Sequence, residues 1–213
     1  MKPNAPLAVL ALAAMAAMLT GCSNAVMDPK YERNPNPRQK YVVTAKIDGA
    51  PGPFEKAFAS VRYKIGPTQE CMPDAEPFSG HFPTPDDFGI EPKVSKVSGT
   101  EYRFEMYLDA MASKNYFGKG ICSWVVDSIN VYLKPVGASK SPEFAALMVQ
   151  SDVTHQQPVV LYARREIYAK PLAHPYDSIE PALKKEPATK RYGSDQTKLF
   201  IITLQAKEVG HEN

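Results

Sequence analysis

The chain of 213 residues carries 25 basic and 23 acidic side chains, so its formal net charge at pH 7 is only +2. Both signs are mixed along the sequence, which argues against the strongly basic face that nucleic-acid-binding proteins need. The 20 proline residues favour many turns and irregular loops over long helices.

The first 21 residues have the pattern of an export signal. Lys2 precedes an apolar run over residues 7–19 that contains no charged residue. The run is shorter than the roughly 20 residues that a helix needs to cross the hydrocarbon core of a membrane. A basic start, an apolar stretch and a small-residue cleavage region are typical of a signal peptide that is removed after export.

The apolar run ends in Leu19-Thr20-Gly21-Cys22, which resembles the lipobox of bacterial lipoproteins. The resemblance implies that diacylglyceryl is added to the Cys22 sulfur, that the chain is cut before Cys22, and that the new amine receives a fatty acid such as palmitate. Several acyl chains form a firm membrane anchor, because each buried methylene contributes about 0.8 kcal/mol. The second residue of the mature chain would be Ser23 and not Asp, and in this it resembles lipoproteins that are sent to the outer membrane. The alternative is an ordinary secretory signal with a chance cysteine.

The remainder of the chain is expected to form one domain. Removing residues 1–21 leaves 192 residues, an ordinary size for a single domain. Residues 22–40 are polar and contain Asn34-Pro35-Asn36-Pro37, so they predict a flexible tether. We therefore expect a single periplasmic β domain over residues 41–213, anchored to the outer membrane through acylated Cys22.

Alternating apolar and polar residues predict most of the strands. The pattern is present in residues 41–48 and 58–65, and it is clearest in residues 100–108. A strand places every second side chain on one face of a sheet, whereas a helix would scatter them. Two further strands are expected over residues 159–168 and 199–207. Residues 144–149 remain open between a strand and a short helix.

The apolar parity changes within residues 121–134. Cys122 shares a parity with Trp124, whereas Ile129 lies on the other. A slip of one residue would turn the apolar set outward, so we predict a β-bulge or break near Asp127-Ser128. About six or seven strands with frequent turn signals predict a mainly β fold, an antiparallel β-sandwich.

Two long proline-rich loops, residues 66–99 and 170–196, interrupt the predicted strands. With Cys22 acylated, Cys71 and Cys122 remain in an oxidising compartment and predict a disulfide. This bridge would pin the first loop to a core strand, and Trp124 is expected to pack beside it. The alternative is a redox or nucleophilic thiol, but neither a Cys-x-x-Cys motif nor a nearby histidine supports it.

The sequence contains no recognisable catalytic motif. A nucleophile elbow, a His-Glu-x-x-His motif, a Walker A loop and a dinucleotide fingerprint are all missing. Asp86-Asp87 is expected to form a solvated turn rather than an acid–base pair, and Gly118-Lys119-Gly120 a tight turn. We predict no enzymatic activity, metal site or cofactor, and we expect four bystander histidines: His81, His155, His174 and His211.

Basic residues occur in three pairs, at Arg164-Arg165, Lys184-Lys185 and Lys190-Arg191. Such pairs can contact anionic lipid head groups close to a membrane anchor. The alternative, which we favour, is that they are loop charges among the acidic residues Glu180, Glu186 and Asp195.

A second resemblance concerns function. The segment Tyr116-Phe117-Gly118-Lys119-Gly120-Ile121-Cys122-Ser123-Trp124, together with Leu199-Phe200-Ile201-Ile202-Thr203-Leu204, is similar to small periplasmic lipoproteins encoded beside type VI secretion effectors. The resemblance implies a non-enzymatic module that binds a protein, in its sharpest form an immunity protein. A disulfide-pinned loop over residues 66–99, rich in Phe and Pro, suits this role because rigid aromatic side chains lose little entropy on binding.

Two alternatives belong to other functional classes. The first is a structural or assembly lipoprotein of an envelope machine such as a secretion or pilus complex. The second is a hydrolase or lipid-handling enzyme whose site is assembled from scattered residues, which no motif supports.

Overall fold

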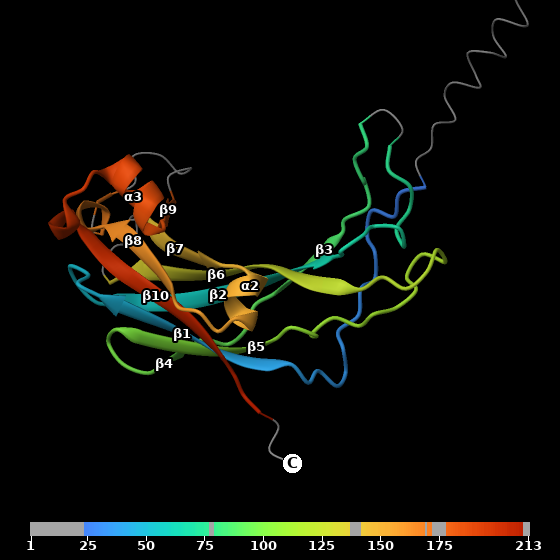
Figure 1. The fold of residues 1–213 in the computed structure, drawn as a ribbon, viewed down its shortest axis with the longest axis horizontal. Coiled ribbons are helices and arrows are strands. Elements are labelled where there is room, and N and C mark those ends of the chain that lie inside the picture. Colours follow the sequence, from blue (N-terminus) through green and yellow to red (C-terminus); the bar gives the residue numbers. More distant parts are fainter. Residues whose placement is uncertain (1–23, 77–78, 137–141, 169, 172–177, 211–213) are drawn as a thin grey trace, which may run out of the picture.

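The computed structural model is a β-sandwich. Within the residues that it describes, ten strands form two five-stranded sheets that pack face to face (Figure 1). Cys22 and the predicted signal peptide lie outside these residues. The described residues are 24–76, 79–136, 142–168, 170–171 and 178–210.

All neighbouring strands of the first sheet run antiparallel. The sheet has the order β4-β5-β1-β10-β8, so the strand nearest the start of the domain pairs with the one nearest its end. This long-range pairing of β1 with β10 closes the domain. The strands are β1 (Lys40–Asp48), β4 (Ser95–Lys96), β5 (Glu101–Tyr107), β8 (Val159–Arg164) and β10 (Leu199–Glu208).

The second sheet has the order β3-β2-β6-β7-β9. Its strands also pair antiparallel, apart from β7 and β9, which run parallel. The run over residues 144–149, which the sequence leaves open between a strand and a helix, is a strand up to Met148, and a short helix, α2 (Gln150–Thr154), begins after Val149. The strands are β2 (Phe54–Ile65), β3 (Asp87–Ile90), β6 (Trp124–Pro135), β7 (Glu143–Met148) and β9 (Ile179–Pro181).

The predicted bulge in the sixth strand is confirmed. Arg62 of β2 pairs with Ser128, but Tyr63 pairs with Val126, so Asp127 has no partner across the ladder. The extra residue returns Val126 to the inner face, where it is buried together with Ile129. A bulge thus reconciles the two parities of this strand.

The core lies between the inner faces of the two sheets. Phe144 has no exposed surface and packs against Phe54 and Phe200, with ring centroids 6.1 Å and 5.0 Å away. Phe200 belongs to the first sheet and the other two rings to the second, so the cluster joins both layers. Each such buried ring contributes about 1.5–3 kcal/mol through removal of apolar surface from water.

Several boundaries differ from the sequence predictions. The strand predicted over residues 159–168 ends at Arg164, because a 3-10 turn, η1 (Arg165–Ile167), follows it. The second proline-rich loop contains β9, the helix α3 (Lys185–Tyr192) and a further 3-10 turn, η3 (Gln196–Lys198). Pro187 fits in the first turn of α3, where a missing backbone N–H breaks no helical hydrogen bond.

Strands β2 and β6 run out of the sandwich into an extension that we call the arm, made of residues 24–38, 66–76, 79–86 and 109–123 (Figure 1). Residues 24–38, which belong to the predicted tether, are part of this arm. The backbone N–H groups of Arg38 and Gln39 donate to the Asp109 carboxylate at 2.8 Å and 2.9 Å, and that of Asn34 to the Ala110 carbonyl at 2.8 Å. The polar composition suggested a free chain, but partners distant in sequence hold this segment.

Candidate functional site

The outer face of the first sheet is charged along β1 and β5, and on β8 it exposes one large apolar side chain, Val160, at 39%. Lys40 of β1 pairs with Glu105 of β5 at 2.8 Å, and Arg103 pairs with Glu101 at 2.6 Å. The outward residues of β10 include Thr203 and other polar side chains. This sheet therefore presents the solvated surface that is usual for one side of an antiparallel sheet.

The outer face of the second sheet carries a continuous apolar row instead. The strand registers place Phe58, Tyr132, Ala145 and Pro181 in one row across β2, β6, β7 and β9. The rings of Phe58 and Tyr132 lie 6.3 Å apart, and Phe58 remains 39% exposed. On either side of the row, Leu147 is 46% exposed and Ile179 51%. We call this set the apolar face: Phe58, Tyr132, Ala145, Leu147, Ile179 and Pro181.

Positive charges border the apolar face. Lys56 of β2 lies directly opposite Lys134 of β6, and within the described residues neither forms an ion pair. Like charges placed directly opposite destabilise a sheet. At the other end of β2, Arg62 and Lys64 are compensated by the carboxylates of Asp87 and Asp86, at 3.5 Å and 3.4 Å. Within the described residues, Lys56 and Lys134 form no such ion pair, although Glu143 lies on the same outer face of the neighbouring strand β7.

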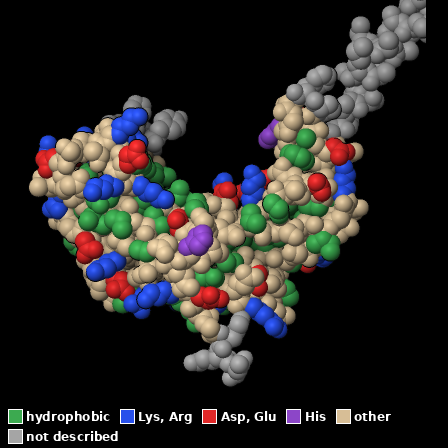
Figure 2. All heavy atoms as spheres, in the orientation of Figure 1, with side chains coloured by type: hydrophobic (Ala, Val, Ile, Leu, Met, Phe, Trp, Pro, Cys, Tyr) green, Lys and Arg blue, Asp and Glu red, His purple; other side chains and the backbone are tan. Residues whose placement is uncertain are grey.

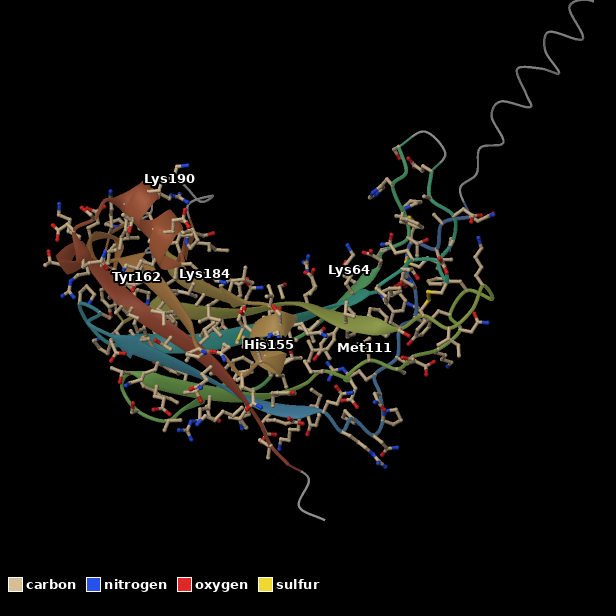
Figure 3. All side chains as sticks on the ribbon, viewed as in Figure 1. Lys64, Met111, His155, Tyr162, Lys184 and Lys190 are labelled. Carbon is tan, nitrogen blue, oxygen red and sulfur yellow. A yellow bond between two sulfur atoms is a disulfide. The ribbon has the colours of Figure 1, made fainter. Side chains whose placement is uncertain are left out.

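The surface above the second sheet is hollowed. Figure 2 shows the depression between the arm and a raised lobe formed by residues 179–192, which comprise β9 and α3. Lys64 and Lys184 lie on its two sides (Figure 3). A partner surface that contacts the apolar face would thus lie between the arm and the lobe.

The lobe is held by a charged and aromatic cluster. Arg164 donates to both carboxylate oxygens of Glu180 at 2.7 Å and 2.9 Å, and its guanidinium lies 5.1 Å from the ring centre of Tyr192. The hydrogen bond with Glu180 raises the pKa of Arg164, and burial raises that of Tyr192. Arg164 therefore serves the fold, whereas Lys184, Lys185 and Lys190 remain exposed.

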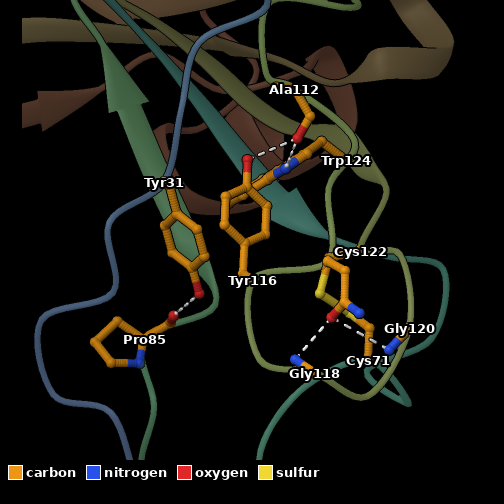
Figure 4. The surroundings of a disulfide bond; sticks show 10 residues. Tyr31, Cys71, Pro85, Ala112, Tyr116, Gly118, Gly120, Cys122 and Trp124 are labelled. Carbon is orange, nitrogen blue, oxygen red and sulfur yellow. Dashed lines mark hydrogen bonds between the residues drawn. A yellow bond between two sulfur atoms is a disulfide. The ribbon is translucent and has the colours of Figure 1, made fainter.

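The arm is held by the predicted disulfide. Cys71 and Cys122 are bridged with their Cα atoms 5.3 Å apart, and both are buried. Trp124 packs against the cluster around the bridge, as predicted, and its Nε1 donates to the Ala112 carbonyl at 3.1 Å (Figure 4). Tyr116 donates to the same carbonyl at 2.7 Å. The bridge therefore links the first proline-rich loop to the segment just before β6, and the shared carbonyl links Trp124 of β6 to Tyr116 in the arm.

Tyr31 completes the arm, and sequence reasoning missed it because it lies in the segment interpreted as a tether. Its ring packs edge-to-face on Trp124 and Tyr116, with centroids 4.7 Å and 5.1 Å away. Its hydroxyl donates to the Pro85 carbonyl. Burial, with a further contribution from the negative charge of Asp86, raises the pKa of Tyr31.

A cavity of about 700 Å³ lies at the edge between the two sheets, lined by β5 and by the link from β3 to β4. Its lining is mixed, with Tyr63 and Phe104 among the apolar residues and Arg103 and Glu105 among the charged ones. The Tyr63 hydroxyl donates to the Tyr107 carbonyl at 2.6 Å, and burial raises its pKa. This tyrosine is therefore engaged in the fold as a neutral hydrogen-bond donor.

The other candidate residues lie apart from each other. His81 in the arm and His155 after α2 are exposed, and His174 and His211 lie outside the described residues. Asp86 and Asp87 form no solvated turn: Asp87 begins β3, and Asp86 accepts a hydrogen bond from Gln69. The part of the chain that the structure describes contains no group of three His, Cys, Asp or Glu residues that could hold a metal ion.

The predicted glycine turn occupies the outer end of the arm. Gly118 and Gly120 have φ angles of 76° and 128°, values that side chains with a Cβ rarely adopt. The Asn115 side-chain oxygen accepts hydrogen bonds from both backbone N–H groups, at 2.7 Å and 3.4 Å. The turn carries the exposed side chain of Ile121.

Among the described residues, no helix is both long and apolar enough to cross a bilayer. Comparisons with protein-family models, with curated proteins and with solved structures found no match to this chain.

Proposed function

We propose that this protein is a membrane-anchored periplasmic lipoprotein that binds another protein through its apolar face. In its sharpest form the proposal is an immunity protein that captures a secreted effector. The observation that carries it is the contrast between the two sheets, since one outer face is paired in charge and the other exposes an apolar row inside a hollow.

The chemistry of the apolar face fits a protein partner. Contiguous exposed apolar side chains on a soluble domain are typical of interaction sites. Phe58 and Tyr132 supply rigid aromatic surface at the β2–β6 end of the row, and aromatic side chains often carry much of the binding energy of an interface. Lys56 and Lys134 at one end, which form no ion pair within the described residues, favour a partner with an acidic rim, because complementary charge speeds and orients association.

The sequence supplies the location. The resemblance of Leu19-Thr20-Gly21-Cys22 to a lipobox supports acylation at Cys22. Mass spectrometry of the N-terminal peptide from isolated membranes tests it: a Cys22 peptide with fatty acyl chains is expected, and a mature chain that starts elsewhere would contradict the anchor.

A matched pair of variants tests the binding face. Leu147→Asp places a charge on the apolar face, and Thr203→Asp places the same charge on the outer face of the first sheet. We expect Leu147→Asp to weaken binding to the effector encoded beside the gene at least 100-fold, about 2.7 kcal/mol, and Thr203→Asp to leave it within about twofold. Calorimetric titration measures both, with thermal unfolding as the check on folding.

The same variants distinguish the immunity role from the assembly role. Cells that produce Leu147→Asp should lose protection from the co-encoded effector, whereas those with Thr203→Asp should keep it. Equal protection by both variants would contradict the proposed face. Loss of a secretion or pilus machine on deletion of the protein, with no effector present, would favour the assembly role instead.

A further inference from the structure

The arm exposes three large apolar side chains. Met27 is 71% exposed, Ile121 70% and Val26 41%. Val26 and Met27 lie at the described start of the chain, and Ile121 lies in the turn before Cys122. The arm therefore exposes apolar side chains of its own in two segments, apart from the apolar face on the sandwich.

Among the described residues, a hydrogen bond fastens the N-terminal segment to the rest of the arm only four residues after Cys22. The backbone N–H of Val26 donates to the Thr84 hydroxyl at 2.9 Å. Four residue steps separate Cys22 from Val26, and a fully extended chain covers about 14 Å over that distance. By comparison, a strand as long as β2 spans about 40 Å. A lipid anchor at Cys22 would thus hold the arm, and not the far end of the sandwich, next to the bilayer.

We propose that the arm is the membrane-facing end of the protein, and that Val26, Met27 and Ile121 rest on the lipid surface. The proposal relies on the lipid anchor proposed above. Apolar side chains at the boundary between head groups and acyl chains lose contact with water. Lys30 and Lys119 lie on the same arm, paired with Asp28 and Asp74, and their long stems can follow apolar groups while the ammonium groups stay among the head groups.

This orientation assigns different roles to the two ends of the molecule. Figure 1 shows α3 at the end of the sandwich away from the arm. The lysines of α3, including Lys190, then face the periplasm and do not contact lipid. The hollow lies between α3 and the arm (Figure 2), so a partner would be captured beside the membrane.

Depth measurements on the acylated protein test the orientation. The protein is reconstituted into vesicles of phosphatidylethanolamine and phosphatidylglycerol, with one fluorophore attached through Ser123→Cys in the arm or Lys190→Cys in α3. Nitroxide groups on the lipid head groups quench a fluorophore that lies among them. We expect at least fivefold stronger quenching at position 123 than at position 190.

Two further variants and one control separate the contributions of the anchor and of the apolar side chains to the quenching at position 123. An insertion of 20 Gly and Ser residues between Ser23 and Asn24 frees the arm from the anchor, so quenching at position 123 should fall severalfold while acylation persists. Met27→Ser combined with Ile121→Ser, with the anchor intact, should reduce it by a smaller factor. Lys207→Ser, a change on the first sheet, is the matched control and should leave it unchanged.

The outcomes separate this proposal from the anchor itself. Absence of acyl chains from Cys22 by mass spectrometry would remove both. Equal quenching at positions 123 and 190 of an acylated protein would contradict the orientation but not the anchor. The molecule would then lie flat on the membrane or have no fixed orientation. If the inserted linker does not change quenching at position 123 of the acylated protein, the short chain between Cys22 and Val26 is not what holds the arm at the bilayer.

Discussion

The sandwich and the arm of this protein are stabilised in different ways. The sandwich has a continuous core to which both sheets contribute, with the Phe54, Phe144 and Phe200 rings near its centre. The buried cluster of the arm contains only Ile65, Met72 and the two bridged cysteines among the described residues, with aromatic rings around it. A small cluster closed by a covalent bond can loosen locally, whereas a shared core unfolds as one unit. Such an arm can keep a defined shape without a large core of its own.

The largest effect is expected from a change in the core of the sandwich. Phe144→Ala removes a fully buried ring and should lower the free energy of unfolding by about 3–5 kcal/mol. Urea unfolding followed by circular dichroism measures the loss. Phe58→Ala, a change of the same type on the exposed outer face, is the control and should cost less than about 1 kcal/mol. Similar losses in both variants would contradict the assignment of the inner and outer faces.

The next effect should be confined to the arm. Replacing both Cys71 and Cys122 with Ala removes a bridge across 51 residues, for which the chain-entropy model gives up to about 4 kcal/mol. We expect amide hydrogen exchange to accelerate in residues 66–76 and 109–123 while β1 and β10 stay protected. Uniform acceleration throughout the domain would show that the arm and the sandwich form one cooperative unit.

A smaller effect is expected from Tyr31→Ala. The variant loses the edge-to-face contacts with Trp124 and Tyr116, worth about 1–2 kcal/mol locally. Cleavage by a protease within residues 24–36 should become about tenfold faster or more, in proportion to the opened population. Tyr41→Phe, which retains the buried ring in β1, serves as the control. An unchanged cleavage rate would mean that Tyr31 does not fasten this segment.

The smallest effect concerns tyrosine ionisation. Burial raises the pKa of both Tyr31 in the arm and Tyr63 in the sandwich, but the negative charge of Asp86 contributes only at Tyr31. Asp86→Asn should therefore lower the pKa of Tyr31 and leave that of Tyr63 unchanged, which alkaline ultraviolet titration of the variants Tyr31→Phe and Tyr63→Phe can separate.

The same shifts predict the direction of the pH dependence. An unfolded tyrosine ionises near pH 10, whereas these two stay neutral to higher pH in the folded protein. Their contribution to stability is complete below about pH 10 and declines as the pH rises further. Stability that rises in this range would contradict the burial of both hydroxyl groups.

The sequence predicted the elements whose signal is local. Alternation in residues 100–108 depends only on neighbouring positions, and the parity change around Asp127 located the bulge without knowledge of the partner strand. The cysteine count and the expected compartment together predicted the bridge between Cys71 and Cys122.

What the sequence did not reveal depends on contacts between distant residues. Tyr31 meets Trp124 only after the fold is formed, so the segment around it resembled a tether. Pro187 concealed α3, although the first turn of a helix accepts proline. The apolar face exists because Phe58, Tyr132 and Ala145 are brought into register on three strands, and no single segment contains that row.

Site-specific photo-crosslinking shows whether the apolar face binds a protein partner. A photoreactive benzoyl-phenylalanine is placed at Leu147 on the apolar face, or at Gln205 on the opposite sheet, in the acylated protein in cells that produce the co-encoded effector. We expect one discrete adduct with the effector from position 147 and none from position 205. Adducts from position 205 alone, or equal adducts from both, would contradict the proposed binding face.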